Sequence, residues 1–437
     1  MNVPDGWRIA TLGEVCAVGP RDAALSEDAP FVPMDAVKVG RREPAYYEQR
    51  GRRGGIRARG NDLLFARITP CLENGKVALL PEQIDAVGGS TEFLVVRPSP
   101  EIDPRFLYFW SLTPSVRDRA KAEMTGTTGR MRLAGKSLSE FAIAFPGLVE
   151  QRRIVEMVEE HLAHLDAADT SLAQAEQRLI ALQEGVIRFA VSGGGEERVV
   201  SPDTLSRAGT ADGELPHLPR GWSWARLGDI ADVVGGVTKD SKKQADPTYV
   251  AAPYLRVANV QRGHLNVDSV TTIRVPPKKL EALRLQPGDV LLNEGGDRDK
   301  LARGWVWDGQ IDDCIHQNHV FRARIRDNLI DARFLSHTAN ALGGKWADRN
   351  GKQTTNLASI SLSMIRKMPV IIPPANTSNQ IADQLADRLD NLDRQRTAIR
   401  AQQHRSTVLR RAVLAAAFAG RLTGASSDSD LIEEVAS

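Results

Sequence analysis

The chain contains little of what would assign it to a specialised class of protein. It has 3 cysteines in 437 residues, and their contexts fit neither a disulfide framework nor a zinc site. No apolar run approaches the roughly 20 residues that cross a bilayer, and residues 1–13 do not form a charged leader followed by an apolar core. We therefore expect a cytoplasmic protein with reduced thiols and no membrane anchor.

An excess of charge of one sign is also missing. The formal net charge is only +2, so the overall charge neither favours nor excludes a nucleic-acid partner. Basic residues are nevertheless concentrated in residues 41–59, which carry seven arginines against two glutamates. This stretch could follow a phosphate backbone or form a solvated surface loop.

An internal repeat is the dominant feature that the sequence does contain. Residues 4–7 (PDGW) lead into 11–15 (TLGEV), and residues 219–222 (PRGW) lead into 226–230 (RLGDI). Each copy continues through a glycine-punctuated mixed segment and closes with a long helical pattern. A repeat of this kind fixes the architecture before single residues are interpreted. It predicts two similar domains related by pseudo-two-fold symmetry, an arrangement that suits a two-part target.

Both repeats predict the same α/β fold. Short β-rich runs are predicted as strands at 62–66, 76–80 and 92–96 in the first copy and at 287–292 in the second. Asp103 and Asp331 stand at matching places as helix caps. We assign the first domain to residues 1–149 and the second to residues 219–376. Residues 193–218 lack periodicity and predict a flexible linker, and the acidic residues 425–437 predict a disordered tail.

Two long helices are predicted at residues 150–192 and 377–424. Apolar residues spaced by three and four give each helix a coiled-coil-like seam, and each would reach roughly 60 Å. The first helix is acidic at its start and the second is basic at its end, which favours antiparallel over parallel pairing. The predicted seam residues are Ile154, Val158, Leu162, Leu165, Leu179, Leu182, Val186, Ile381, Leu385, Leu389, Leu392, Leu409 and Val413.

Searches for catalytic motifs find none that is complete. Residues 135–137 (GKS) resemble the end of a phosphate-binding loop, but Arg130 occupies the position of its leading glycine. Residues 246–249 (DPTY) lack the second proline of the amino-methyltransferase motif. Both segments are better explained as turns, and we predict no catalytic residues.

A metal site is also not predicted. Cys314, His316 and His319 could suggest one, but an alternating strand that contains both histidines would direct them to opposite faces. The acidic residues near Glu294 loosely resemble a nuclease cluster, and the glycines at 295 and 296 favour a turn instead. A polar strand that presents hydrogen-bonding side chains explains this region better than a ligand set.

Polar loops at matching places in the two repeats are suited to DNA. Residues 125–130 (TGTTGR) and 349–356 (RNGKQTTN) each combine backbone amides, hydroxyls and a cation, the groups that contact phosphates. Arg, Asn and Gln can also make bidentate contacts to guanine or adenine edges. Each of these residues could instead have a structural role in the core or on the surface. The predicted DNA-binding residues are Arg52, Arg53, Arg67, Lys76, Thr127, Thr128, Arg130, Asn293, Arg298, Lys300, Arg303, Gln317, Asn318, Lys352 and Gln353.

The duplicated order of these motifs resembles the specificity (S) subunit of type I restriction-modification systems, the HsdS family. The phrase PxGWxxxxLG(D/E) opens both halves, and FPGLVEQRRI at 145–154 enters the first long helix. The family usually has a double proline followed by Glu-Gln at that place. The second half keeps IPP at 372–374 but has TSNQ at 377–380. Residues 292–300 (LNEGGDRDK) and 316–319 (HQNH) also resemble target recognition domains of this family.

The resemblance implies a protein without catalytic activity of its own. Each α/β domain would read one half of a bipartite double-stranded DNA target in the major groove. The antiparallel helices would set the spacing and dock two methyltransferase subunits, which would bring S-adenosylmethionine, so this chain would bind no cofactor. Motor-nuclease subunits would join to complete a restricting complex that methylates adenine and cleaves DNA.

Two other functions are alternatives to this one. A stand-alone DNA methyltransferase or nuclease with degenerate motifs would need a complete methyl-donor pocket, which the sequence does not show. A coiled-coil scaffold with two unrelated interaction domains would explain the helices. It would not explain why both domains open with the same phrase.

Overall fold

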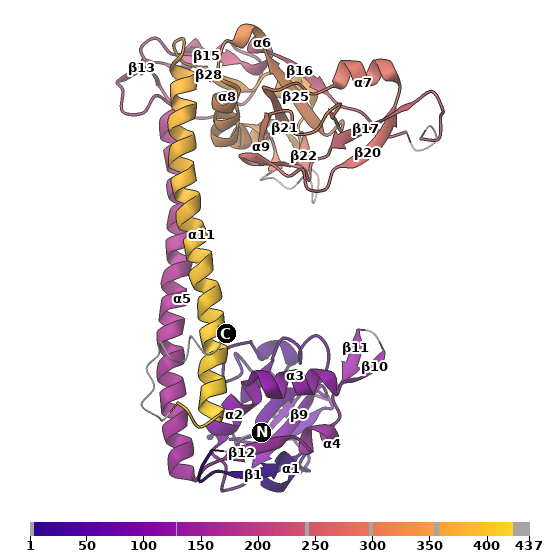
Figure 1. Cartoon of the computed structure of the whole chain (residues 1–437), viewed down its shortest axis with the longest axis vertical. Helices are drawn as coiled ribbons and strands as arrows, with labels where there is room; N and C mark the ends of the chain where they lie inside the picture. Colours follow the sequence, from indigo (N-terminus) through magenta and orange to yellow (C-terminus); the bar gives the residue numbers. More distant parts are fainter. Residues whose placement is uncertain (1–3, 128, 241–243, 297–299, 354–357, 423–437) are drawn as a thin grey trace. The chain divides into compact units, whose positions relative to one another are not determined.

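The computed structural model describes residues 4–127, 129–240, 244–296, 300–353 and 358–422 (Figure 1). Its contacts divide the chain into two compact units, Met1–Gln174 with Ile399–Ser437, and Ala175–Ala398. Each unit holds one α/β domain and a segment of each long helix, α5 (Leu148–Val191) and α11 (Thr377–Phe418). Among the described residues, no helix is both long and apolar enough to cross a membrane.

A four-stranded antiparallel sheet forms the centre of each domain, and the two sheets have the same strand order. In the first domain the order is β2 (Cys16–Val18), β9 (Phe93–Pro98), β6 (Leu63–Ala66) and β7 (Val77–Leu79). In the second it is β16 (Ala231–Gly235), β25 (Val320–Ile325), β21 (Asp289–Asn293) and β23 (Gly304–Trp307). The predicted fold class, two similar α/β domains with a pair of long helices, is confirmed.

The central strands are buried on both faces, which explains their uninterrupted apolar sequences. Side chains alternate between the two faces of a strand. Leu63 and Phe65 of β6 accordingly pack in one hydrophobic core, and Leu64 and Ala66 pack in another. The first of these cores also contains α2 (Pro104–Leu112). The central sheet therefore separates two apolar layers and is held rigidly between them.

A second sheet in each domain contains one parallel strand pair. The first-domain sheet has the order β4 (Glu48–Gln49), β3 (Pro30–Val32), β8 (Val87–Gly89) and β5 (Ile56–Ala58), with β3 and β8 parallel. The second-domain sheet has the order β20 (Thr271–Val275), β17 (Val250–Leu255) and β24 (Ile315–His316), with β17 and β24 parallel. Two-stranded pairs add β1 (Arg8–Thr11) with β12 (Ala142–Phe145), β15 (Ser223–Arg226) with β28 (Pro369–Ile372), and β18 (Val260–Gln261) with β19 (His264–Leu265).

Short helices connect these strands in each domain. Those of the first are α1 (Leu12–Val15), α3 (Pro114–Ala122), α4 (Gly135–Ser139) and the 3₁₀ turn η1 (Met34–Ala36). Those of the second are α6 (Leu227–Ile230), α7 (Pro277–Leu283), α8 (Ala332–Thr338), the π-helical turn η6 (Ala339–Gly343), α9 (Gly344–Asn350), α10 (Leu362–Ile365) and the 3₁₀ turns η2 (Pro202–Thr204) and η5 (Arg326–Asn328).

The predicted helix caps join the repeats to the long helices in the same way. Asp103 caps α2 by accepting from the Arg105 amide, and Asp331 caps α8 by accepting from the Arg333 amide. The amide of Asp103 donates to Oε1 of Gln151 in α5 at 2.8 Å. The Asp331 amide donates to Oγ of Ser378 in α11 at 3.0 Å. Ser378 thus provides the acceptor that the missing Glu-Gln would supply.

A buried ion pair recurs in both central sheets. Arg97 Nη2 lies 2.7 Å from Oδ2 of Asp62, and Arg324 Nε lies 2.7 Å from Oδ1 of Asp289. Both aspartates are buried, and each also accepts a hydrogen bond from the backbone amide three residues before it. Because a buried carboxylate is costly unless it is paired, these arginines hold the ends of β6 and β21 in place.

Within each unit the long helices pack in opposite directions. In the first unit, Ile154 and Val158 near the start of α5 share a core with Val413 and Ala417 near the end of α11. Arg410 Nη2 also lies 2.7 Å from the carboxylates of both Asp166 and Asp169, the acid-to-base match that the sequence predicts. In the second unit, the end of α5 shares a core with the start of α11. The predicted antiparallel pairing is confirmed.

The predicted seam residues differ in burial. Ile154, Val158, Leu385 and Val413 are buried. Leu182 departs from the prediction because its side chain is 51% exposed. The half-buried face of this part of α5 contains Ile180, Gln183 and Ile187, and Leu182 lies outside that face. The remaining seam residues are half-buried: Leu162, Leu165, Leu179, Val186, Ile381, Leu389, Leu392 and Leu409.

Residues 193–218, expected to form a flexible linker, instead pack on the second domain. β13 (Arg198–Val200) pairs with β14 (Leu218–Pro219), and Leu205 and Leu218 are buried in its core. Asp212 accepts hydrogen bonds from Arg226 Nη1 at 2.8 Å and Trp346 Nε1 at 3.0 Å. A few anchoring side chains therefore fix a segment whose average composition is that of a linker. The tail predicted at 425–437 lies outside the described residues.

Candidate nucleic-acid interface

A polar cluster of Arg67, Glu92 and Arg132 lies at the end of the central strand β6 in the first domain. Arg67 directly follows β6, its amide donates to the Glu92 carbonyl at 2.9 Å, and its carbonyl accepts from the Leu133 amide at 2.8 Å. Leu133 in turn follows the hairpin of β10 (Thr125–Thr127) and β11 (Arg130–Arg132). The fold thus brings three segments that are far apart in the sequence to one place.

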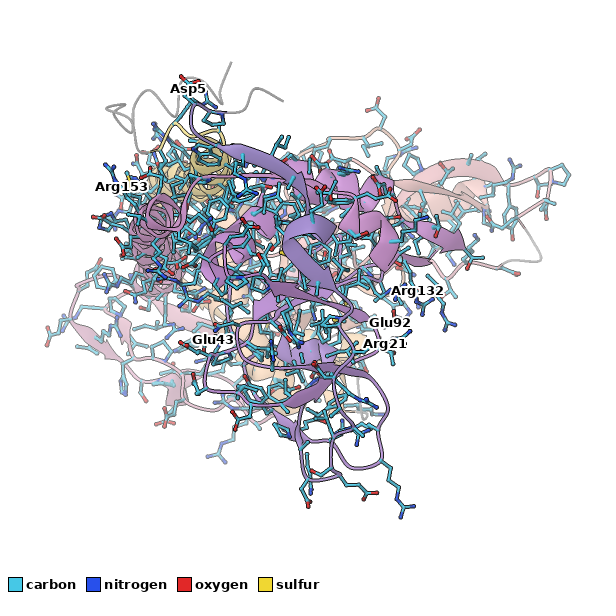
Figure 2. The ribbon with its side chains drawn as sticks, turned by 90° about the horizontal axis from the view of Figure 1, so that it is seen from below. Asp5, Arg21, Glu43, Glu92, Arg132 and Arg153 are labelled. Carbon is cyan, nitrogen blue, oxygen red and sulfur yellow. The ribbon has the colours of Figure 1, made fainter. Side chains whose placement is uncertain are left out.

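The side chains of this cluster are ordered by an ion pair. Arg132 donates to Glu92 from Nε at 3.0 Å and from Nη2 at 2.6 Å (Figure 2). These hydrogen bonds lower the pKa of Glu92, although partial burial opposes them. Figure 2 shows this pair on the other side of the domain from Arg153, which belongs to α5. The cluster therefore faces away from the helix pair.

The second domain builds the same site with different side chains. Glu294 directly follows β21, its amide donates to the His319 carbonyl at 3.0 Å, and its carbonyl accepts from the Ile360 amide at 2.8 Å. Three short strands meet beside it: β22 (Gly295–Gly296), β27 (Ala358–Ser359) and β26 (Lys352–Gln353). Arg67 and Glu294 are thus equivalent positions of the repeat, as are Glu92 and His319.

Hydrogen bonds also order the second cluster. Nδ1 of His319 lies 2.6 Å from Oε2 of Glu294, and Nε2 of His319 lies 3.4 Å from Nδ2 of Asn318. An amide nitrogen can only donate, so we assign the proton of a neutral His319 to Nδ1. Glu294 then accepts that hydrogen bond and keeps further lone pairs for other donors.

The comparison with protein families decides what these domains are. The model described as type I restriction modification DNA specificity domain matches residues 4–177 and 219–407, which include both domains and most of both long helices. The chain belongs to this family. The resemblance noted in the sequence is thereby confirmed, and the DNA-recognition role of the family applies to the two α/β domains.

Curated specificity subunits are similar to this family member over most of its length. It is 22% identical over 489 residues to the type I restriction enzyme EcoEI specificity subunit of Escherichia coli, covering 92% of this chain and 81% of that protein. It is 25% identical over 334 residues to the StySPI specificity subunit of Salmonella potsdam, covering 75% of this chain and 67% of that protein.

Solved structures of specificity subunits share the fold. One chain, from a study of "complex assembly and conformational transition of the type I R-M system", has a TM-score of 0.73 at 20% identity and covers 96% of this chain and 100% of its own. The HsdS subunit from Thermoanaerobacter tengcongensis has a TM-score of 0.56 at 20% identity and covers 96% of this chain and 98% of its own. At this identity the likeness concerns the fold.

Several predicted DNA-binding residues of this specificity protein lie on exposed surface. Thr127 and Arg130 are exposed on the β10–β11 hairpin, and Lys352 is exposed on β26. Asn318 is half-buried beside His319. Thr128 and Arg298 lie outside the described residues, as does the side chain of Gln353. The structure therefore places predicted residues of both repeats close to the two clusters.

Other predicted residues already have partners within the protein. Arg53 is exposed, but it pairs with Glu48 and stacks 4.4 Å from the centre of the Phe31 ring. Arg52 lies 3.5 Å from Glu27. Lys76 donates to the Met34 carbonyl at 3.1 Å. The arginine-rich stretch thus combines exposed charge with structural hydrogen bonds.

Asn293 is a wrong prediction as a DNA contact. It is fully buried, and its Nδ2 donates to the Val260 carbonyl at 2.9 Å. Gln317 is half-buried, and its backbone amide donates to the Leu255 carbonyl at 2.9 Å. Lys300 and Arg303 are half-buried and interact within the protein. Adjacency to a polar loop was therefore a poor guide to which side chains reach the surface.

The predicted alternating strand through His316 and His319 is also wrong. His316 belongs to β24 in the second sheet, whereas Val320 begins β25 in the central sheet, so the chain must turn between them. His316 is buried, and burial lowers its pKa to about 4. Within the described ranges, no group of three or more His, Cys, Asp and Glu side chains is placed to hold a metal.

Glu92 and Arg132 were not predicted from the sequence, and His319 and Glu294 were predicted only as parts of polar segments, not as DNA-binding residues. The signal that could have found them is their place directly beside the ends of the central strands. Glu294 follows β21, and Glu92 precedes β9. Strand pairing is needed to bring such positions together, and it cannot be read from a single strand.

Proposed function

We propose that this chain is the DNA-reading subunit of a type I restriction-modification complex with a bipartite target. Each domain reads one half of that target in the major groove. The observation that carries the proposal is that the end of the central strand meets a pair of short antiparallel strands in both domains, and that the polar side chains at this place differ between the domains. The same backbone arrangement with different polar side chains suits two half-sites of different sequence.

The paired helices set the distance between the half-sites and dock two methyltransferase subunits. Within the second unit, Leu182 and Phe189 of α5 are 51% and 50% exposed and lie seven residues apart, close to one face of the helix. Large exposed apolar side chains on a helix are typical of a partner contact. The methyltransferase subunits supply S-adenosylmethionine and the catalytic groups, motor-nuclease subunits join to restrict DNA, and this chain contributes recognition alone.

The test is co-expression of the chain with the methyltransferase subunit of its complex, followed by single-molecule sequencing of the host genome. We expect methylated adenines in a split motif with a fixed unread gap. A continuous short motif would contradict the two-reader arrangement. Methyl transfer by the purified chain alone would show instead that the chain is itself an enzyme.

A further inference from the structure

Arg67 and Glu294 occupy one position of the repeat and carry opposite charges. Each follows the central strand of its domain, donates its amide to the residue before the neighbouring strand, and accepts an amide from the residue after the hairpin. The distances agree closely, at 2.9 and 2.8 Å around Arg67 and 3.0 and 2.8 Å around Glu294. The backbone hydrogen bonds around these two positions are therefore the same in both domains, whereas the side chains carry opposite charges.

The neighbours of the two side chains differ in charge in a matching way. Arg67 lies in the electrostatic field of Glu92, whose carboxylate is fixed by two hydrogen bonds from Arg132. Glu294 accepts from His319, at the position equivalent to Glu92. In each domain the neighbour therefore carries a group complementary to residue 67 or 294. The hydrogen bond from His319 orients Glu294, whereas Nε of Arg67 is buried without a hydrogen-bond partner among the described residues, so Arg67 keeps an unused donor.

A cation and a carboxylate recognise different base edges in the major groove. An arginine donates two hydrogen bonds to O6 and N7 of guanine, and a glutamate accepts from the N4 amino group of cytosine. Both groups are half-buried beside an exposed hairpin, so they are partly desolvated and still accessible. A reading group benefits from this combination, because its unused hydrogen-bonding capacity is unsatisfied when the wrong base is present.

We propose that positions 67 and 294 form a single specificity-determining position of the repeat, at which Arg67 selects guanine in one half-site and Glu294 selects cytosine in the other. Glu92 with Arg132, and His319 with Asn318, act as positioning residues. This inference rests on the proposed function. It adds that each half-site contains a G·C pair read at this place, and that the orientation of the pair follows the sign of the side chain.

The test uses two single variants, Arg67→Gln and Glu294→Gln, each of which replaces a charged side chain by a neutral amide. Each variant is made in the full chain and co-expressed with its methyltransferase. The methylated motif and the methylation rate at its sites are then mapped. Each change should reduce the methylation rate of the original motif roughly 10- to 100-fold, because the contact of a charged side chain to one base is lost. In each variant, the methylated motif should also contain adenine, or any base, in place of the base that the substituted residue reads. This change should be confined to the half-site of that residue. Glu281→Gln, on exposed α7, and Arg8→Gln, on exposed β1, are the matched controls and should leave the motif unchanged.

The unaltered half-site reports whether each variant is folded, since a misfolded chain would lose both halves. Arg67→Lys retains a guanine-binding cation and should keep guanine in the motif. An unchanged motif in both glutamine variants, a change in both halves at once, or a parent half-site without a G·C pair would overturn the inference. A continuous parent motif would instead overturn the proposed function, so the two failures are distinguishable.

Discussion

Asp212 shows how one side chain can determine the structure of a segment. Its carboxylate accepts from Arg226 and Trp346, and the Arg226 side chain is almost entirely buried. The hydrogen bonds from Arg226 are the largest of the effects that lower the pKa of Asp212 below its ordinary value. This pair joins residues 206–212 to the start of the second domain, since Arg226 also donates to the Ser206 carbonyl at 2.6 Å.

Loss of this pair should release the segment. In Asp212→Ala, we expect residues 198–216 to become sensitive to limited proteolysis at neutral pH, because a buried arginine loses its partner at a cost of about 3–5 kcal/mol. A folded pKa below the unfolded one means that the stabilisation is complete above the ordinary pKa of Asp, near 4, and is lost as the pH falls through the folded pKa. The native chain should therefore show the same cleavage under an acid-active protease as the pH is lowered below about 4. Asp203→Ala, an exposed change in the same segment, is the control. Equal resistance of the Asp212 and Asp203 variants would contradict this account.

At the scale of elements, the seam between the long helices depends on few side chains. Leu385 is 1% exposed in the core of the second unit, whereas Leu182 lies outside the seam. Both residues satisfy the apolar spacing that predicts a seam, so the pattern alone gives them equal weight. The structure distinguishes them because a helix with 3.6 residues per turn buries only the stripe that meets its neighbour.

This difference gives a matched pair of substitutions. Leu385→Ala should reduce the local stability of the second unit by about 2–5 kcal/mol, because it leaves a cavity in a packed core. Leu182→Ala should change that stability by less than about 0.5 kcal/mol, as exposed substitutions do. Hydrogen exchange of amides in α5 and α11 measures both. Comparable losses of protection in the two variants would show that Leu182 is part of the seam.

For the molecule as a whole, the repeat is the source of the proposed function. The central sheets, the capped helices α2 and α8, and their hydrogen bonds to α5 and α11 recur in the same order. If the helices set the distance between two readers, their length must determine the unread gap in the DNA.

Insertion of four residues into both helices tests this relation. Each helix lengthens by about 6 Å, close to the rise of two base pairs. We expect the gap of the methylated motif to grow by one or two base pairs while both half-sites stay the same. Insertion of four residues into the exposed turn at 308–310, away from the helices, is the control and should leave the gap unchanged. A gap that does not respond to the helix insertions would remove the helices as the determinant of spacing.

Much of this organisation could be predicted from the sequence because it repeats. The two opening phrases, the caps Asp103 and Asp331 and the acid-to-base match now seen at Arg410 are local signals that the structure bears out. The packing of residues 193–218 could not be predicted, since it depends on Asp212 meeting Arg226 and Trp346 through tertiary contacts. Arg67 and Asn318 were predicted as DNA-binding residues, but their assembly into clusters with Glu92 and Glu294 could not be predicted for the same reason, because non-local strand pairing brings them together.

The most direct test of the central claim is exchange of residues 219–376 for the corresponding domain of another member of the family. The chimaera would be co-expressed with the methyltransferase, and genomic adenine methylation would be mapped against the parent. We predict that one half of the split motif changes, while the other half and the gap are retained. A change in both halves, or an unchanged motif, would contradict the assignment of one half-site to each domain.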